Sequence, residues 1–234
     1  MIDHWTLERV LRDAWPALEE HEAYGWVARL AGGDTRRPNA INPLGPDAGD
    51  VTEAVEHFRS HYARSGLRLI VRVPDFCPPA DAALAEAGYA TEGRTRTIAA
   101  DLAGRVMPNH PGLELSSHPD AAWISARVGA EGDPATEALL ARLMLPAVFA
   151  TVRVEGTVAA IGYAVIDAGV AVIESIRTAA AFRGQGLGTT CVGALLAASA
   201  AAGAGMACLQ VEAANLAGLA LYRGLGFDRH LYDY

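Results

Sequence analysis

The sequence contains no lysine, and all 19 of its basic residues are arginine. The absence of lysine excludes Schiff-base chemistry, a pyridoxal phosphate anchor and the lysine of a P-loop. Only three cysteines are present, Cys77, Cys191 and Cys208, without a CxxC pair or a His/Cys cluster of ligand spacing. We therefore expect neither a disulfide framework nor a metal site, and we expect a reduced, cytoplasmic protein.

Positive charge is scarce as well. The formal net charge is −8, and the excess of acidic residues is the same in both halves of the chain. No basic arm is available to bind a phosphate backbone, so we expect no nucleic-acid partner. The uncharged run 192–209 is mostly alanine and is interrupted by Gly203 and Gly205. This composition favours a buried helix, a turn and a strand over a membrane span, and the charged N-terminus is unlike a signal peptide.

The hydropathy pattern predicts helices and strands along the whole chain. Before residue 106 we expect helices at 5–20, 51–65 and 80–88 and strands at 25–31, 67–73 and 90–102. After the proline-containing segment 106–112 we expect strands at 113–117, 148–154, 157–166, 170–178, 207–212 and 227–234, and helices at 121–129, 136–145, 186–201 and 216–224. Hairpins followed by strand–helix–strand units predict an α/β (α+β) fold with a mixed sheet and helices on both faces. The break predicts two domains, 1–108 and 109–234.

A glycine-rich run joins an expected strand to an expected helix. Residues 183–188 read Arg-Gly-Gln-Gly-Leu-Gly. Glycine lets backbone N–H groups approach an anion closely, and the N-terminus of the following helix adds partial positive charge. The run therefore predicts a pyrophosphate-binding loop that needs no lysine, although it is also typical of tight helix–sheet packing. It is neither a Walker A loop nor a dinucleotide fingerprint, because their lysine and glycine spacing are missing.

A second motif follows about 30 residues downstream. There, an expected strand is followed by Asn215 and by a helix that ends in Leu-Tyr-Arg-Gly-Leu-Gly-Phe, residues 221–227. Together the two motifs resemble those of the GNAT superfamily of acyl-CoA-dependent N-acyltransferases, and the likeness spans residues 113–234. The resemblance implies a mixed, mostly antiparallel GNAT sheet flanked by helices.

The resemblance also implies the site. Acetyl-CoA, or another acyl-CoA, would be the donor, and no metal would be required. The implied cofactor-binding residues are Ile176, Arg177, Thr178, Arg183, Gly184, Gln185, Gly186, Leu187, Gly188 and Asn215. Tyr222 would donate a proton to the departing CoA thiolate, and it lies two helical turns from Asn215 on the same helix. Core packing is the alternative role of Tyr222.

The attacking amine must lose a proton to a base or to a water chain. Glu174 is the candidate base, because strand alternation places its side chain on the same side as Ile176 and Thr178. Its apolar neighbours would favour proton uptake, and a carboxylate on a solvated strand face is the alternative. Glu212 is a second, weaker candidate. Gln210 replaces a glutamate of the ribosomal-protein acetyltransferases in this superfamily, which argues against a protein N-terminal substrate handled in their manner.

The first half of the chain also resembles a known arrangement. Its strand and helix order, with the run 25–41, is similar to the degenerate GNAT-like N-terminal half of tandem GNAT proteins. This smaller half would form a wall of the substrate cleft, with Arg37, Asn39 and Asn42 as candidate substrate contacts; a polar turn is the alternative. We expect a strand of the first half, or a partner subunit in a homodimer, to cover the sheet edge left by the final strand.

These observations predict an N-acetyltransferase that acts on a primary amine of a small molecule, such as an amino acid, an amine metabolite or an amine-bearing antibiotic. A protein acetyltransferase acting on lysine or N-terminal amines is one alternative. A catalytically silent CoA-binding sensor or scaffold is another. The expected partner is the amine substrate, with neither nucleic acid nor membrane.

Overall fold

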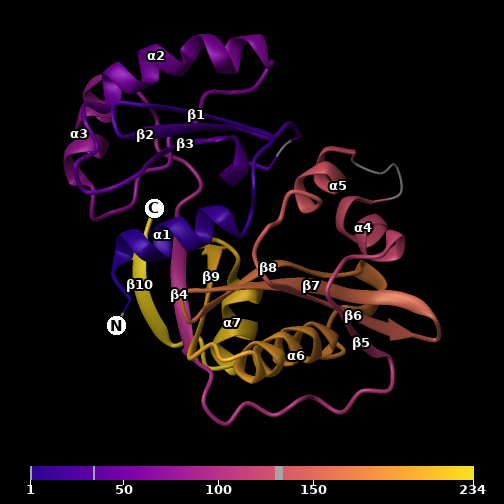
Figure 1. Cartoon of the computed structure of the whole chain (residues 1–234). Coiled ribbons are helices and arrows are strands. Elements are labelled where there is room, and N and C mark those ends of the chain that lie inside the picture. The colour runs from indigo at the N-terminus through magenta and orange to yellow at the C-terminus, as the bar shows by residue number, and fades with distance from the viewer. Residues whose placement is uncertain (1, 34, 130–133) are drawn as a thin grey trace.

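The computed structural model describes residues 2–33, 35–129 and 134–234 (Figure 1). Most strands form one seven-stranded sheet with the order β10-β4-β9-β8-β7-β6-β5. They are β4 (Thr95–Asp101), β5 (Leu113–Ser116), β6 (Ala147–Val154), β7 (Thr157–Asp167), β8 (Val170–Thr178), β9 (Met206–Glu212) and β10 (Arg229–Asp233). Neighbouring strands are antiparallel except β8 and β9, which are parallel. The expected mixed, mostly antiparallel sheet is confirmed.

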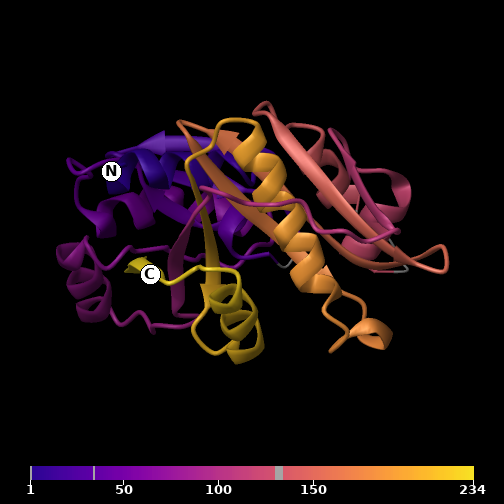
Figure 2. The ribbon, with the colours of Figure 1, turned by 90° about the horizontal axis from the view of Figure 1, so that it is seen from below.

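Helices cover both faces of this sheet. On one face, α6 (Leu187–Ala201) and α7 (Leu216–Gly224) pack on an apolar cluster, and Figure 2 shows α6 crossing the sheet. On the other face lie α1 (His4–Asp13) and α4 (Ala121–Val128), followed by α5 (Pro134–Leu140). The uncharged run 192–209 forms the end of α6, a turn and the start of β9. None of the described helices is long and apolar enough to cross a membrane.

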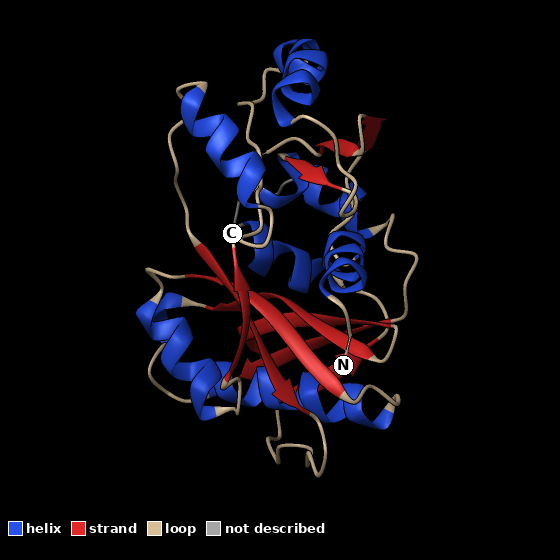
Figure 3. Ribbon diagram, turned by 90° about the vertical axis from the view of Figure 1, so that its left-hand side faces the viewer, coloured by secondary structure: helices blue, strands red, loops and turns tan. Residues whose placement is uncertain are grey.

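A smaller unit packs on the α1 side of the large sheet, opposite α6 and α7 (Figure 3). It contains the antiparallel strands β1 (Glu19–Ala23), β2 (Trp26–Leu30) and β3 (Ile41–Pro43), the turn η1 (Arg37–Asn39), and the helices α2 (Val51–Arg64) and α3 (Pro78–Glu86). Trp26, Phe58 and Tyr62 are the largest side chains of its own apolar core. The unit therefore has a hydrophobic cluster separate from those of the large sheet.

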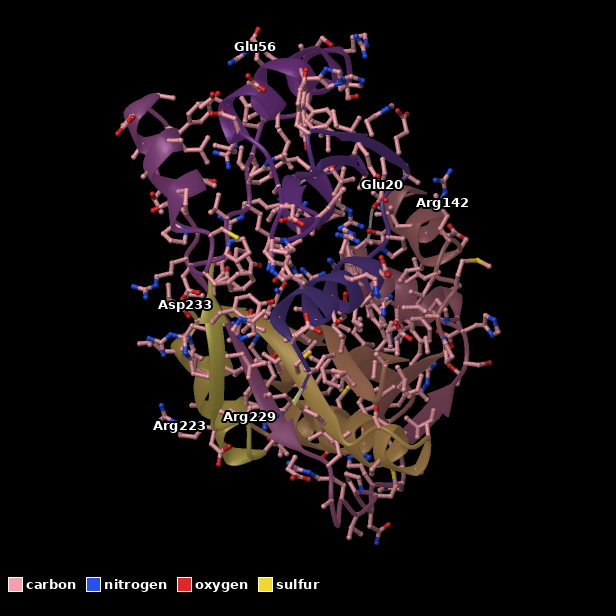
Figure 4. The ribbon with its side chains drawn as sticks, turned by 60° about the vertical axis from the view of Figure 1, so that its left-hand side comes forward. Glu20, Glu56, Arg142, Arg223, Arg229 and Asp233 are labelled. Carbon is pink, nitrogen blue, oxygen red and sulfur yellow. The ribbon has the colours of Figure 1, made fainter. Side chains whose placement is uncertain are left out.

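Buried polar contacts join the two units. Glu8 of α1 and Arg72 form an ion pair, with Arg72 Nη2 donating to Glu8 Oε1 at 2.8 Å and both side chains less than a tenth exposed. The hydroxyl of Tyr232 on β10 also donates to Glu8. Figure 4 shows Asp233 at the end of β10 next to the smaller unit, where it accepts a hydrogen bond from Arg94 Nε at 2.8 Å. Asp233 N–H also donates to Asp75 Oδ2, ahead of α3, at 3.0 Å, so strand β10 is tied to both units.

Strand β4 precedes residue 108 yet lies inside the large sheet, between β9 and β10. It pairs with β9 from Thr95 opposite Glu212 to Asp101 opposite Met206. A strand of the first half therefore covers the edge of β9 as expected, and the final strand β10 pairs with β4 and is the outermost strand of the sheet. The division into domains 1–108 and 109–234 stays a prediction, and the sheet itself extends across residue 108.

Two expected elements differ from the structure. The helix expected at 5–20 ends at Asp13, because Pro16 lacks the N–H that a continuing helix needs, and residues 19–20 begin strand β1. Residues 67–73, expected to form a strand, form an extended connection instead. Within it, Val71 forms an isolated β-bridge with Ile41. Side chains of this connection line a cavity described below. The other expected elements are present, with ends that differ by a few residues.

Candidate active site

The parallel strands β8 and β9 separate toward their C-terminal ends. Their register runs from Val170 opposite Met206 to Val172 opposite Cys208 and ends there. Over residues 173–178, the edge of β8 that faces β9 pairs with no strand of the described part of the chain, so its backbone polar groups are open to a ligand. We call this opening, between residues 173–178 and 209–212, the β8/β9 split. The loop that leads into α6 begins at its end.

A β-bulge changes the direction of side chains along β8. Ser175, with a φ of 54°, and Ile176 together stand opposite Gly162 of β7. Ile176 consequently lies on the α6 side, over Gly162, and Thr178 also lies there, while Glu174 faces the smaller unit. The expectation that Glu174 shares a side with Ile176 and Thr178 is wrong, because the extra residue shifts the strand alternation by one position.

The glycine-rich loop leads into the N-terminus of α6 as expected, after the short turn η2 (Ala180–Phe182). Gly184 and Gly186 have φ values of 76° and 78°, a left-handed conformation that favours glycine. No side chain of the described residues caps the N-terminus of α6. The helical hydrogen bond that reaches the N-cap residue, Gly186, is donated by the Thr190 N–H to the Gly186 carbonyl at 3.0 Å. The N–H groups of 187–189 therefore point out of the helix end, where they can bind an anion.

Tight packing accounts for Gly188 but not for the loop glycines. A Cβ on Gly188 would lie 3.0 Å from Thr178 Oγ1 and 3.1 Å from Leu221 Cδ1. A Cβ on Gly184 or Gly186 would meet open space. The two loop glycines thus serve the backbone conformation, whereas Gly188 allows α6, α7 and β8 to approach one another.

Polar side chains of the loop region bind backbone carbonyls. Arg183 Nε donates to the carbonyl of Thr178 and Gln185 Nε2 to that of Ala181, both at 3.3 Å. Arg177 donates to carbonyls near the end of α4. These side chains hold the loop and α4 in place, so contacts with a cofactor would come from the backbone of the loop.

Asn215 and Tyr222 lie near opposite ends of α7. Asn215 is the N-cap, and its Oδ1 accepts a hydrogen bond from Gly218 N–H at 2.9 Å. Tyr222 packs on the α6-side cluster, with its ring centroid 5.7 Å from that of Phe227. No hydrogen bond within the described ranges engages the Tyr222 hydroxyl. The ring is therefore a packing residue whose hydroxyl remains free to donate.

The environment of Tyr222 keeps its proton in place. Burial raises the pKa of the hydroxyl to about 12, and the Glu174 carboxylate acts in the same direction while Arg37 opposes it. Both charged groups lie on the opposite side of the sheet, so their effect reaches Tyr222 across the region of the split. Near neutral pH the hydroxyl is fully protonated, as a proton donor must be.

An arginine of the smaller unit reaches the split from the α1 side. Arg37 donates to both oxygens of Glu174, at 2.5 Å and 2.7 Å, and its Nη1 lies 3.3 Å from Gln210 Oε1 of β9. Glu174 is 2% exposed and Arg37 is 29% exposed. Burial is the largest single effect and would lower the pKa of the guanidinium, but the charge of Glu174, the hydrogen bonds to it and the nearby Tyr234 and Tyr163 together raise it. Arg37 thus bridges both strands of the split.

The role of Glu174 as a base stays a prediction. Because both of its oxygens accept from Arg37, it can take up a proton only when this pair opens. A solvated strand face, the alternative for Glu174, does not describe a side chain that is 2% exposed. Glu212, the second candidate, is 54% exposed and accepts a hydrogen bond from Arg36.

Asn39 and Asn42 organise the chain around η1. Asn39 Oδ1 accepts from the N–H of Ala31 at 2.6 Å, and its Nδ2 donates to the carbonyls of Gly32 and Thr35. Asn42 Nδ2 donates to the carbonyl of Ala40 at 2.8 Å, and both asparagines are buried. Neither lines the larger cavity beside Arg37 that is described below, although Asn42 lines a small hollow together with Arg37 and Gln210. Their expected role as substrate contacts stays a prediction that these bonds do not support.

A cavity of about 590 Å³ lies beside Arg37, between the smaller unit and β9. Its polar wall includes Arg36, Arg37, Gln210, Glu212 and Tyr234, and its apolar wall includes Leu69, Ile70, Val71, Val73, Leu84 and Ala85. We call it the Arg37 cavity. The sequence did not predict this cavity, because the pattern of residues 67–73 indicates a strand. The adjacent Arg36 and Arg37 in an expected loop were the available signal of a polar site.

Two of the three cysteines behave as core residues. All three are free thiols, and Cys191 and Cys208 are buried in the clusters on opposite faces of the sheet. Burial raises the pKa of Cys191 to about 12, so its thiol is unreactive near neutral pH. Among the described residues, no three His, Cys, Asp or Glu side chains are grouped to hold a metal ion. The cytoplasmic location stays a prediction.

Comparison with solved structures shows the same fold. A GCN5-related N-acetyltransferase from Kribbella flavida has a TM-score of 0.67 and 20% identity, covering 97% of this chain and 90% of its own. A GCN5-related N-acetyltransferase from Sphaerobacter thermophilus has a TM-score of 0.61 and 13% identity, covering 83% and 70%. A tandem GNAT protein from the clavulanic acid biosynthesis pathway has a TM-score of 0.55 and 15% identity, covering 83% and 74%.

Sequence comparison identifies the family. No curated protein sequence matches the chain. The family model described as "Probable histone acetyltransferase Rv0428c C-terminal" matches residues 3–234. The expected resemblance to the GNAT superfamily, tandem members included, is therefore confirmed. The chain belongs to the family of the C-terminal region of the probable histone acetyltransferase Rv0428c and is an acyltransferase with the GNAT fold.

Proposed function

We propose that the protein transfers the acetyl group of acetyl-CoA to a primary amine of a small molecule. The observation that carries this proposal is the β8/β9 split. An uncapped helix N-terminus follows one of its strands, Tyr222 lies on one side of it and Arg37 lies on the other. Donor and acceptor would approach the split from opposite faces of the sheet.

The residues of the donor side fit acetyl-CoA, which supplies an activated acyl thioester. The N–H groups of 187–189 and the positive end of α6 would hold the pyrophosphate. The free edge of β8 at Ile176 and Thr178 would bind the pantetheine arm. The side-chain oxygen of Asn215 already caps α7, and its side-chain nitrogen would donate a hydrogen bond to the cofactor.

Two proton movements accompany the transfer. The amine nitrogen forms a bond to the acetyl carbonyl carbon, the carbon–sulfur bond breaks, and its electron pair leaves on the CoA sulfur. Tyr222 would donate its hydroxyl proton to this sulfur and regain one from solvent. The proton lost by the amine would pass to Glu174 after Arg37 withdraws, or to a water chain.

The Arg37 cavity is the proposed acceptor site. It includes Gln210 and Glu212 from β9, so it adjoins the split on the face opposite α6 and α7. Its volume of about 590 Å³ lies within the roughly 300–1,000 Å³ that is usual for small-molecule sites. A cavity between two packed units suits a small amine better than a folded protein surface.

Protein acetylation is the second candidate, and the description of the family as a probable histone acetyltransferase favours it. A lysine side chain also presents a primary amine on a flexible apolar stem. The two candidates differ in the acceptor that supports turnover. A CoA-binding sensor would bind the donor and turn over neither acceptor.

The first test is titration of the purified protein with acetyl-CoA by calorimetry. Ligand at about 100 times its dissociation constant should stabilise the protein by roughly 2.7 kcal/mol, visible as an increase in Tm. Release of free CoA in the presence of small amines, a histone peptide or neither then separates the candidates. Absence of binding at millimolar acetyl-CoA would refute the proposed function.

A further inference from the structure

The wall of the Arg37 cavity restricts the chemistry of the acceptor, and this inference rests on the proposed function. The wall toward the smaller unit is mainly apolar, with Arg68, Arg72 and Asp81 among its aliphatic residues. The aliphatic residues are Leu69, Ile70, Val71 and Val73 of the extended connection and Leu84 and Ala85 of α3. The four residues of the connection are half-buried although they are aliphatic. A ligand with an apolar body would cover this surface and gain free energy from its removal from water.

Every arginine of the wall already has a carboxylate partner. The pairs are Arg36 with Glu92 and Glu212, Arg37 with Glu174, Arg68 with Glu92, and Arg72 with Glu8. A ligand carboxylate would therefore have to displace a protein carboxylate before it could bind a guanidinium. The buried pairs, Arg37 with Glu174 and Arg72 with Glu8, would resist such an exchange most strongly.

One carboxylate of the wall belongs to none of these ion pairs. Asp81, in the first turn of α3, lines the cavity and forms no ion pair with any residue of the described ranges. The wall and its partners together thus carry more negative than positive charge. Glu212 lies at the split end of the cavity, is half-exposed and shares Arg36 with Glu92, so its charge is only partly neutralised and it can also attract a cation there. The balance favours an ammonium group over an anion.

From this wall we infer that the acceptor is a primary amine carried on an apolar ring or chain, without a carboxylate. Its apolar body would pack on residues 69–73 and on α3. Its amine would enter as the ammonium ion toward Glu212 and the split, and lose a proton there to Glu174 or to a water chain before attack. Free amino acids would be disfavoured by their carboxylate, and polyamines by their lack of a continuous apolar body.

The test compares phenethylamine, phenylalanine, spermidine and a lysine-containing histone peptide as acceptors for the full chain with acetyl-CoA, and measures CoA release. We expect kcat/KM for phenethylamine to exceed that for each of the others at least tenfold. The Ala85→Trp variant fills the cavity from an exposed helix position and should raise KM for phenethylamine at least tenfold, with KM for acetyl-CoA unchanged. Ala82→Trp, exposed on the same helix but outside the cavity, is the matched control.

The outcomes separate this inference from the proposed function. Acetyl-CoA binding with faster transfer to phenylalanine, spermidine or the peptide overturns the acceptor class and leaves an acetyltransferase. Binding without transfer to any amine overturns it too, and supports the sensor. Equal KM values for phenethylamine in Ala85→Trp and Ala82→Trp, with both variants folded by circular dichroism, show that the cavity is not the acceptor site. Failure to bind acetyl-CoA refutes the proposed function itself.

Discussion

Replacement of Arg37 with methionine should lower the free energy of unfolding by about 3 kcal/mol. Glu174 is 2% exposed, and Arg37 binds both of its oxygens, so the variant leaves a buried carboxylate without its counter-charge. Loss of one partner from a buried pair costs about 3–5 kcal/mol. We expect the lower end because Arg37 is 29% exposed, which lets water reach the site. For a chain of 234 residues this corresponds to a decrease in Tm of roughly 6–12 °C.

Urea denaturation, followed by tryptophan fluorescence and by circular dichroism, measures this loss. The matched control is the double variant Arg37→Met/Glu174→Leu, which removes both charges and should recover at least about 2 kcal/mol of the deficit. A loss below about 1 kcal/mol in the single variant would refute the reasoning. A double variant as unstable as the single one would also refute it, since the unpaired charge would then not be the cause.

Three further predictions concern the donor side of the site. Tyr222→Phe keeps the ring that packs on Phe227 and removes the hydroxyl, so kcat should fall roughly 100- to 10,000-fold while acetyl-CoA affinity, measured by calorimetry, stays the same. An unchanged kcat would leave packing as the only role of this side chain. Because burial raises the pKa of Tyr222 to about 12, its donating form is fully present below that pKa and is lost as pH rises through it. The kcat profile should therefore show no descending limb near pH 10, where an unperturbed tyrosine titrates; a limb there that vanishes in Tyr222→Phe would contradict the assignment. Gly186→Ala places a Cβ at a φ of 78°, which should cost about 1–2 kcal/mol and weaken acetyl-CoA binding about tenfold. Gly205→Ala, in open space and outside the left-handed region, is its control, and equal calorimetric affinities for the two variants would exclude a role for the loop.

The structural parts of the proposed donor side could be predicted because they are local in sequence. The conformation of the loop depends on Gly184 and Gly186, and the helix that it precedes is contiguous with it. Asn215 and Tyr222 belong to one helix, α7, whose bounds agree with the expected 216–224. In such segments the hydrogen bonds close within a few residues, so residue types and spacing carry the information.

The contacts on the proposed acceptor side could not be predicted in the same way. Arg37 meets Glu174 across 137 positions of sequence, and no local pattern announces that contact. The bulge at Ser175 depends on the register between β7 and β8. This bulge places the Glu174 side chain on the face of the sheet opposite to the expected one. A one-residue shift in a strand moves its side chains to the opposite face, so a small error of register changes the whole assignment.

Local patterns of residues were thus sufficient to indicate the superfamily, the order of the long helices and strands from β4 onward, and the backbone loop that would hold a pyrophosphate, but not strands β1 and β3. Only the packing of distant segments settled that β4 lies between β9 and β10, that Arg37 bridges the β8/β9 split, and that residues 67–73 form the wall of a cavity. The physical reason is that helix caps and glycine turns satisfy their own hydrogen bonds locally. Strand partners, buried ion pairs and cavities exist only after segments remote in sequence have met.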